Sequence, residues 1–99
     1  MTSTASINQL QAEIADWIEP INPDRTANST ISKLLEEIGE LIASERMSDP
    51  LELADVGILV LDLFQLQRVD FAQAVQAKMA INRSRSWQVA DNGAMKHTT

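Results

Sequence analysis

The chain has 99 residues, enough for one domain with a modest core. It contains no cysteine, which excludes a disulfide framework and a thiolate zinc site and fits a cytoplasmic protein. The net charge of −6, without an offsetting basic stripe, argues against a nucleic-acid polymer as the partner, and no apolar run is long enough to span a membrane. An anionic small molecule still fits this charge if a divalent cation stands between it and the carboxylates.

The first predicted helix covers about residues 6–18. Its apolar residues recur at helical spacing and are Ile7, Leu10, Ile14 and Trp17. Because Trp17 lies on this stripe, we expect it to pack in the core in preference to stacking on a ligand. Pro20 and Pro23 then end the helix.

The second predicted helix starts within the polar stretch 26–30, which supplies several N-caps, and stops near residues 43–45. Its apolar residues share one face and are Ile31, Leu34, Leu35, Ile38, Leu41 and Ile42. This pattern is typical of a helix with one side on the core.

The third predicted helix has the clearest start signal in the chain. Asp49 is a good N-cap, Pro50 suits the first helical position, and Glu52 falls at the capping-box position. The helix runs to about Gln67 and is apolar on nearly all sides from residue 53 onward. Such a helix must be covered all round.

Three other short helices cannot cover the third helix alone, so we expect a second subunit to cover part of it. Asp62 lies within its apolar stretch. We expect this carboxylate to pair with a basic residue across the subunit interface, without a catalytic role.

The fourth predicted helix begins after Asp70, an N-cap with Gln73 three residues on. The stretch 88–99 has no periodicity and is predicted to be a disordered tail, which leaves residues 1–87 as the folded domain. The fold class that follows is all-α, a four-helix bundle completed by oligomerisation.

Acidic residues gather on the second and third helices. Glu36, Glu37 and Glu40 lie on the second helix, and Glu52 and Asp55 lie on the third. Residues three apart share a helix face, and a short loop makes the two helices antiparallel neighbours. Counting from the loop with the rise of an α-helix, about 1.5 Å per residue, places the two acidic turns at similar heights.

Four of these carboxylates, all except Glu36, are therefore expected to converge. Such close like charges repel unless a cation neutralises them. Oxygen ligands without imidazole or thiolate favour Mg²⁺, with Mn²⁺ as a substitute.

The alternative is a solvated acidic surface, in which Glu52 serves only as a capping-box residue. Against it, apolar residues such as Ile38 and Leu53 interleave with the acids, which places the acids at the border of the core. Clustered like charges also destabilise each helix. The residues alone leave both interpretations open.

The acids form a recognisable motif. The segment KLLEEIGEL contains EExxE, eleven residues separate Glu40 from Glu52, and ELADV contains ExxD; K-x-x-x-N-x-x-R-x-W follows later. Residues 31–87 thereby resemble the MazG-like, all-α nucleoside triphosphate pyrophosphohydrolase superfamily, and the small size is similar to its phage-type members.

The resemblance implies Mg²⁺-dependent hydrolysis of (deoxy)nucleoside triphosphates to the monophosphate and pyrophosphate, in nucleotide-pool cleaning or dNMP supply, with a lean to purine dNTPs. It implies a catalytic site of Glu36, Glu37, Glu40, Glu52 and Asp55. Of these, all but Glu36 look like metal ligands, and Glu36 binds a further ion or orients the attacking water. Family members are dimers or dimers of dimers, with helices from two subunits building each site.

The resemblance also implies substrate-binding residues. Lys78, Asn82 and Arg85 recur at about one-turn intervals and form one face of donors for phosphate and sugar. The alternative is a solvated basic helix end, which the macrodipole favours. Arg83 is adjacent and is an alternative to Arg85.

Two further residues belong to the expected substrate site. Lys33, one turn before Glu37, is either a phosphate contact or an i,i+4 salt-bridge partner. Trp87 ends the motif and is expected to stack on a base or to cover the mouth of the pocket. The alternative to an enzyme is a non-catalytic helical adaptor or antitoxin-like protein, in which the third helix binds a partner and the acids only solubilise.

Overall fold

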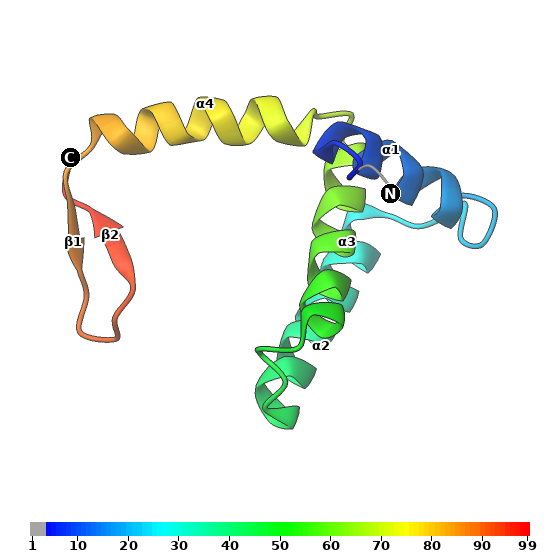
Figure 1. Ribbon diagram of the computed structural model, residues 1–99, viewed down its shortest axis with the longest axis horizontal. Helices are drawn as coiled ribbons and strands as arrows, with labels where there is room; N and C mark the ends of the chain where they lie inside the picture. Colours follow the sequence, from blue (N-terminus) through cyan, green and yellow to red (C-terminus); the bar gives the residue numbers. More distant parts are fainter. Residues whose placement is uncertain (1–3) are drawn as a thin grey trace.

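The computed structural model describes residues 4–99, which form four helices followed by a two-stranded hairpin (Figure 1). The elements are α1 (Ile7–Ile18), α2 (Ala27–Ser44), α3 (Pro50–Leu66), α4 (Phe71–Ser84), β1 (Trp87–Val89) and β2 (Met95–His97). The helical fold class and the four helices predicted from the sequence are confirmed. In this part of the chain, no helix has the length and hydropathy to cross a bilayer.

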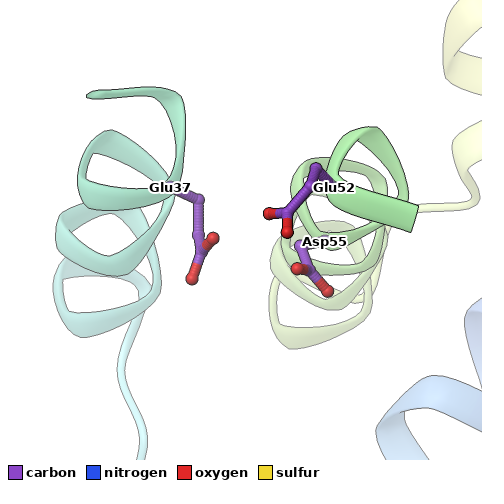
Figure 2. Close-up of side chains that lie close together, drawn as sticks. All are labelled: Glu37, Glu52 and Asp55. Atoms are coloured by element: carbon purple, nitrogen blue, oxygen red, sulfur yellow. The ribbon is translucent and has the colours of Figure 1, made fainter. Parts of the chain in front are cut away.

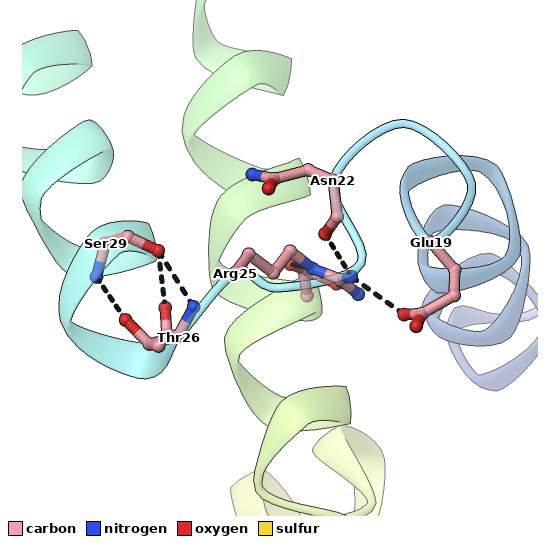
Figure 3. Close-up of polar contacts among 6 residues, drawn as sticks. Glu19, Asn22, Arg25, Thr26 and Ser29 are labelled. Carbon is pink, nitrogen blue, oxygen red and sulfur yellow. Dashed lines mark hydrogen bonds and ion pairs between the residues drawn. The ribbon is translucent and has the colours of Figure 1, made fainter.

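Each helix begins at a side chain that satisfies the free N–H groups of its first turn. The N-caps are Ser6, Thr26, Asp49 and Asp70. At the start of α2, the hydroxyl of Thr26 accepts a hydrogen bond from the N–H of Ser29, and the Ser29 hydroxyl accepts one from the N–H of Thr26 (Figure 3). Glu45, with a left-handed φ of 59°, ends α2.

The helices α2 and α3 form an antiparallel pair joined by residues 45–49, and α1 packs against α3 near the end of α3 that lies away from this loop (Figure 1). The antiparallel pairing expected from the short loop is confirmed. It brings the middle of α2 next to the first turns of α3.

A buried ion pair connects the α1–α2 loop with α3. Nε and Nη2 of Arg25 donate to the two carboxylate oxygens of Asp62 at 2.7 and 2.8 Å, and Nη1 donates to Glu19 at 2.9 Å (Figure 3). Asp62 is 1% exposed. The prediction that Asp62 pairs across a subunit interface is wrong, because the Arg25 side chain reaches it within the same chain.

Gln11 fixes the connection between α3 and α4. Its side-chain amide donates to Oε1 of Gln65 at 3.1 Å and to the carbonyl of Val69 at 2.8 Å, and its side-chain oxygen accepts from the N–H of Phe71 at 3.0 Å. One buried α1 side chain thus hydrogen bonds to the end of α3, the connection and the start of α4.

The direction set by this connection takes α4 away from the other helices. α4 packs on α1, and beyond that contact it extends away from α2 and α3 as an arm with the hairpin at its tip (Figure 1). Within one chain, α1, α2 and α3 therefore pack together while α4 leaves most of its surface uncovered.

Few apolar side chains are buried inside a single chain. Among residues 4–99, Leu41 and Leu61 are the buried apolar side chains, each 8% exposed. Trp17 is 66% exposed, so its predicted core packing is wrong for the isolated chain. The helical spacing identified an apolar stripe, of which Ile14 is half-buried and Trp17 lies uncovered in the single chain.

The structure also differs from the prediction of a disordered tail in residues 88–99. β1 and β2 pair antiparallel, with Trp87 opposite His97 and Val89 opposite Met95. Gly93, with a φ of 85°, supplies the left-handed residue of the turn between them. Strands of three residues are too short to show a period-two pattern, so sequence periodicity did not reveal them.

Candidate active site

Three carboxylates from two helices face one another across the α2–α3 pair. Glu37 projects from α2, and Glu52 and Asp55 project from successive turns of α3 (Figure 2). One oxygen from each of the three lies within 4.8 Å of the others. The predicted convergence of the two acidic turns therefore occurs for these three residues.

The other two acids of the motif lie beside this cluster and not in it. Glu40, one turn nearer the loop, lines a hollow of about 380 Å³ together with Glu52 and Arg46. The side chain of Glu36 is 58% exposed, in keeping with its different direction on the helix. The expected four-way convergence is thus reduced to three carboxylates with a fourth at the adjoining hollow.

Two basic side chains partly compensate the acidic charge. Lys33 contacts Glu36 at 3.3 Å and Glu37 at 3.4 Å. Hydrogen bonds to these two carboxylates raise the pKa of Lys33 above its usual value, and the bond to Glu36 has the larger effect. The salt-bridge alternative for Lys33 is therefore present in the structure. Arg46 contacts Glu52 at 3.3 Å. Among the described residues, Asp55 has no ion-pair partner.

The contact with Arg46 also bears on the alternative reading of Glu52. In a capping box, the side chain of Glu52 would accept from the N–H of Asp49. Instead it turns toward Arg46, while the Asp49 side chain accepts from Glu52 N at 3.4 Å without a reciprocal bond. Glu52 is therefore free to face Glu37 and Asp55.

The donor set fits a hard divalent cation. The cluster offers carboxylate oxygens and neither imidazole nor thiolate, which are the ligands that Mg²⁺ and Mn²⁺ accept. Glu37 has a side chain only 15% exposed. Like charges this close repel one another, and a cation bound between the carboxylates relieves that repulsion.

The predicted substrate-binding face of α4 does not reach this cluster within one chain. Lys78, Asn82 and Arg85 lie in the second half of the arm, which Figure 1 places well away from the middle of α2 and the start of α3. The side-chain oxygen of Asn82 is buried and accepts no hydrogen bond from the described residues. This oxygen is therefore a buried hydrogen-bond acceptor whose donor is not among the described residues.

Trp87 folds back on the end of α4. Its indole N–H donates to the carbonyl of Asn82 at 2.7 Å, and its ring packs edge-on against His97 with centroids 5.7 Å apart. The hairpin thus holds Trp87 beside Asn82 and at the same end of the arm as Arg85.

Sequence reasoning missed two arginines that pair with acidic residues of α3, Arg46 with Glu52 and Arg25 with Asp62. Arg46 lies in the loop between the two acidic motifs, so a basic residue at that place was a readable signal for a partner of Glu52. Arg25 lies in the loop before α2, and its pairing with Asp62 spans 37 positions, beyond any local pattern.

Comparison with known proteins supplies the family. The model of the dATP/dGTP pyrophosphohydrolase family matches residues 10–98, which include both acidic helices, the α4 arm and the hairpin. The chain belongs to this family. Its membership makes the protein a MazG-like nucleotide pyrophosphohydrolase, and the alternative of a non-catalytic adaptor is wrong.

Two phage proteins that are similar to this chain share one name, dATP/dGTP diphosphohydrolase. The dATP/dGTP diphosphohydrolase of cyanophage S-2L is 66% identical over 93 residues, covering 94% of this chain and 89% of that protein. The dATP/dGTP diphosphohydrolase of Salmonella phage PMBT28 is 43% identical over 95 residues, covering 96% of this chain but 32% of that longer protein.

A solved structure is also similar over nearly the whole chain. The cyanophage S-2L MazG-like pyrophosphohydrolase, bound to dGDP and three catalytic Mn²⁺ ions per active site, matches with a TM-score of 0.90 at 64% identity. The match covers 97% of this chain and 100% of that one. The similarity therefore extends over the α4 arm.

Proposed function

We propose that this pyrophosphohydrolase hydrolyses purine deoxynucleoside triphosphates, dATP and dGTP, to the monophosphate and pyrophosphate with Mg²⁺ as the working ion. The observation that carries the proposal is the convergence of Glu37, Glu52 and Asp55 within 4.8 Å. The names of the phage relatives support the choice of substrate, and the Mn²⁺ ions of the cyanophage structure support the choice of cation class.

Each acid of the motif has a proposed role. Glu37, Glu52 and Asp55 hold the ions, and Glu40 completes the ligand set from the adjoining hollow that it shares with Glu52. Bound ions would lower the pKa of a coordinated water and neutralise charge on the triphosphate. Glu36, on the exposed side of the cluster, orients the attacking water or holds a further ion.

Lys33 changes partner in this proposal. Its ammonium bridges Glu36 and Glu37, which are the carboxylates that a cation would neutralise. Once cations neutralise these carboxylates, the same ammonium is free to contact a phosphate oxygen. The two interpretations of Lys33 then describe two states of one side chain.

The site is completed by a second copy of the chain. Lys78, Asn82 and Arg85 lie on an arm that leaves its own acidic cluster, so we assign them to the cluster of a neighbouring subunit. Lys78 and Arg85 would pair with phosphate oxygens, and the unpartnered Asn82 oxygen would accept from a sugar hydroxyl or a partner donor. Trp87, held beside Asn82, would cover the pocket mouth.

The exposed apolar surface of α2 supports this homo-oligomer. Its outward side chains follow the spacing of a helix-packing seam and are Ile31, Leu35, Ile38 and Ile42, with exposures of 41, 65, 39 and 66%. A continuous stripe of this kind is typical of a subunit interface. A dimer or a dimer of dimers would cover it, and the enzyme would then serve nucleotide-pool cleaning or dNMP supply.

Product analysis tests the reaction. The protein is incubated with dATP, dGTP, dCTP or dTTP and Mg²⁺, and the products are resolved by anion-exchange chromatography. We expect dNMP and pyrophosphate from the two purine substrates, and no turnover after chelation of the metal. Release of orthophosphate in place of pyrophosphate would contradict the proposed reaction, and equal turnover of all four substrates would contradict the proposed purine preference.

A further inference from the structure

A second hollow lies beside Lys33, which also contacts the carboxylate cluster. Its volume is about 340 Å³, and its lining includes Ile18, Asn22, Arg25, Thr30, Lys33 and Leu59. Lys33 contacts Glu37 at 3.4 Å, and Leu59 lies four residues, about 6 Å along the helix, after Asp55. A molecule with phosphates at the cluster can therefore place its next chemical group in this hollow.

The two hollows differ in chemistry. The hollow at the loop end has Glu40, Glu52 and Arg46 in its wall, which suits ions and phosphate. The hollow beyond Lys33 has the apolar walls of Ile18 and Leu59 together with amide and hydroxyl groups. The charged groups in its lining are Lys33 and the ion pair of Arg25 with Asp62. Apolar walls with a few placed polar groups are typical of a site for an aromatic ligand.

We propose that the hollow beyond Lys33 is the base pocket of this enzyme and that Asn22 is the residue that recognises the purine. This inference rests on the proposed function, because it takes a nucleoside triphosphate as the substrate. It assigns a residue in the α1–α2 loop, outside the acidic motif and outside the α4 arm.

The backbone of Asn22 is held in place while its side chain is free. The Asn22 carbonyl accepts from Nη1 of Arg25 at 3.2 Å, and Arg25 is itself held by Asp62 and Glu19. The carboxamide makes no hydrogen bond with the described residues and extends from the loop toward α3, away from Glu19 (Figure 3). The fixed backbone keeps an unpaired amide at the edge of the hollow, where it can donate to and accept from a ligand.

A carboxamide suits an enzyme that takes both purines. Adenine presents the N7 acceptor and the N6 amine, whereas guanine presents two acceptors, N7 and O6. The amide of Asn22 can donate to N7 in both bases, and its orientation lets it accept from N6 of adenine or donate to O6 of guanine. A pyrimidine has no N7, so it would not offer this common acceptor.

Two substitutions at position 22 separate the contributions of the amide. Asn22→Leu removes donor and acceptor and should lower kcat/KM for dATP and dGTP alike, by about tenfold. Asn22→Asp loses the donor to N7 in both bases, but it keeps an acceptor for N6 of adenine and repels O6 of guanine. It should therefore lower kcat/KM for dGTP about tenfold more than for dATP. Asn28→Asp makes the same chemical change on the exposed first turn of α2 and should leave both values unchanged.

The same variants are tested for binding of dGDP and dADP with Mn²⁺ by calorimetry, which does not depend on turnover. A wild-type protein that binds these nucleotides without hydrolysing any triphosphate would contradict the proposed function, while the binding preference of Asn22→Asp would still test the pocket. Wild-type values and an unchanged dATP-to-dGTP ratio in both position-22 variants would overturn the assignment of Asn22.

Discussion

The guanidinium of Arg25 carries its charge inside the protein, with a side chain 5% exposed. Its hydrogen bonds to Asp62 are the largest cause of a pKa of Arg25 raised well above the usual value, so the guanidinium remains charged. The pair joins the α1–α2 loop to the second half of α3, about two turns beyond Asp55. Removing one partner would leave the other charge buried without compensation.

We expect Arg25→Met to lower the free energy of unfolding by about 3–5 kcal/mol, because the Asp62 carboxylate loses its partner. Urea denaturation followed by circular dichroism measures this. The double variant Arg25→Met/Asp62→Leu should recover most of the loss. Arg83→Met, on the exposed end of α4, serves as the control and should change stability by less than about 0.5 kcal/mol. A loss no larger than that of the control would show that the pair does not hold the loop.

At the scale of elements, local sequence determines where α4 begins, whereas long-range contacts determine its direction. Its start was readable from Asp70, but its direction depends on hydrogen bonds from Gln11, which lies 60 positions before Phe71. No periodicity encodes a contact over that distance. The helix was therefore predictable as a helix, whereas its departure from α2 and α3 was not.

In the candidate site, too, some features follow from local spacing and others depend on long-range contacts. The i,i+3 spacing of Glu52 and Asp55 and the length of the loop after α2 were sufficient to predict that they meet Glu37. The exclusion of Glu40 from the cluster depends on the turn geometry of α2 and the crossing of two helices, which counting residues does not resolve. Whether Trp17 is covered depends on a partner surface, which one chain's pattern cannot identify.

The arm leads to a prediction about two inactive variants. Asp55→Asn disables the acidic cluster, and Lys78→Ala/Arg85→Ala disables the arm. If arms serve a neighbouring subunit, co-refolding equal amounts should restore about a quarter of wild-type activity, because half of the dimers are mixed and each has one intact site. Steady-state hydrolysis of dGTP measures it.

A mixture as inactive as its two components would place arm and cluster of one site in the same chain. Size-exclusion chromatography of differently tagged variants controls for exchange of subunits.

At the scale of the whole molecule, a single chain leaves large apolar side chains in water. Leu51 is 78% exposed at the start of α3, and Ile42 is 66% exposed on the α2 stripe. Burial of apolar surface is the main favourable term in folding, so we expect a chain with two buried apolar residues in its described part to be stabilised by association.

We therefore expect the melting temperature to rise with protein concentration over the micromolar range, since association stabilises the folded chain by mass action. Differential scanning fluorimetry at several concentrations measures it. Leu35→Glu, at the centre of the α2 stripe, should lower the oligomeric state in analytical ultracentrifugation, whereas Glu13→Gln on α1 should not. A concentration-independent melt of a monomer would contradict the homo-oligomer.

The most direct test of the metal-dependent mechanism is Mn²⁺ binding measured alongside dGTP hydrolysis in wild-type protein, Glu37→Gln and Asp55→Asn. We expect the wild type to bind Mn²⁺ and hydrolyse dGTP, and both variants to lose binding and turnover while keeping the helical circular dichroism spectrum. Wild-type hydrolysis in both variants, with no ion bound, would contradict the assignment of these carboxylates.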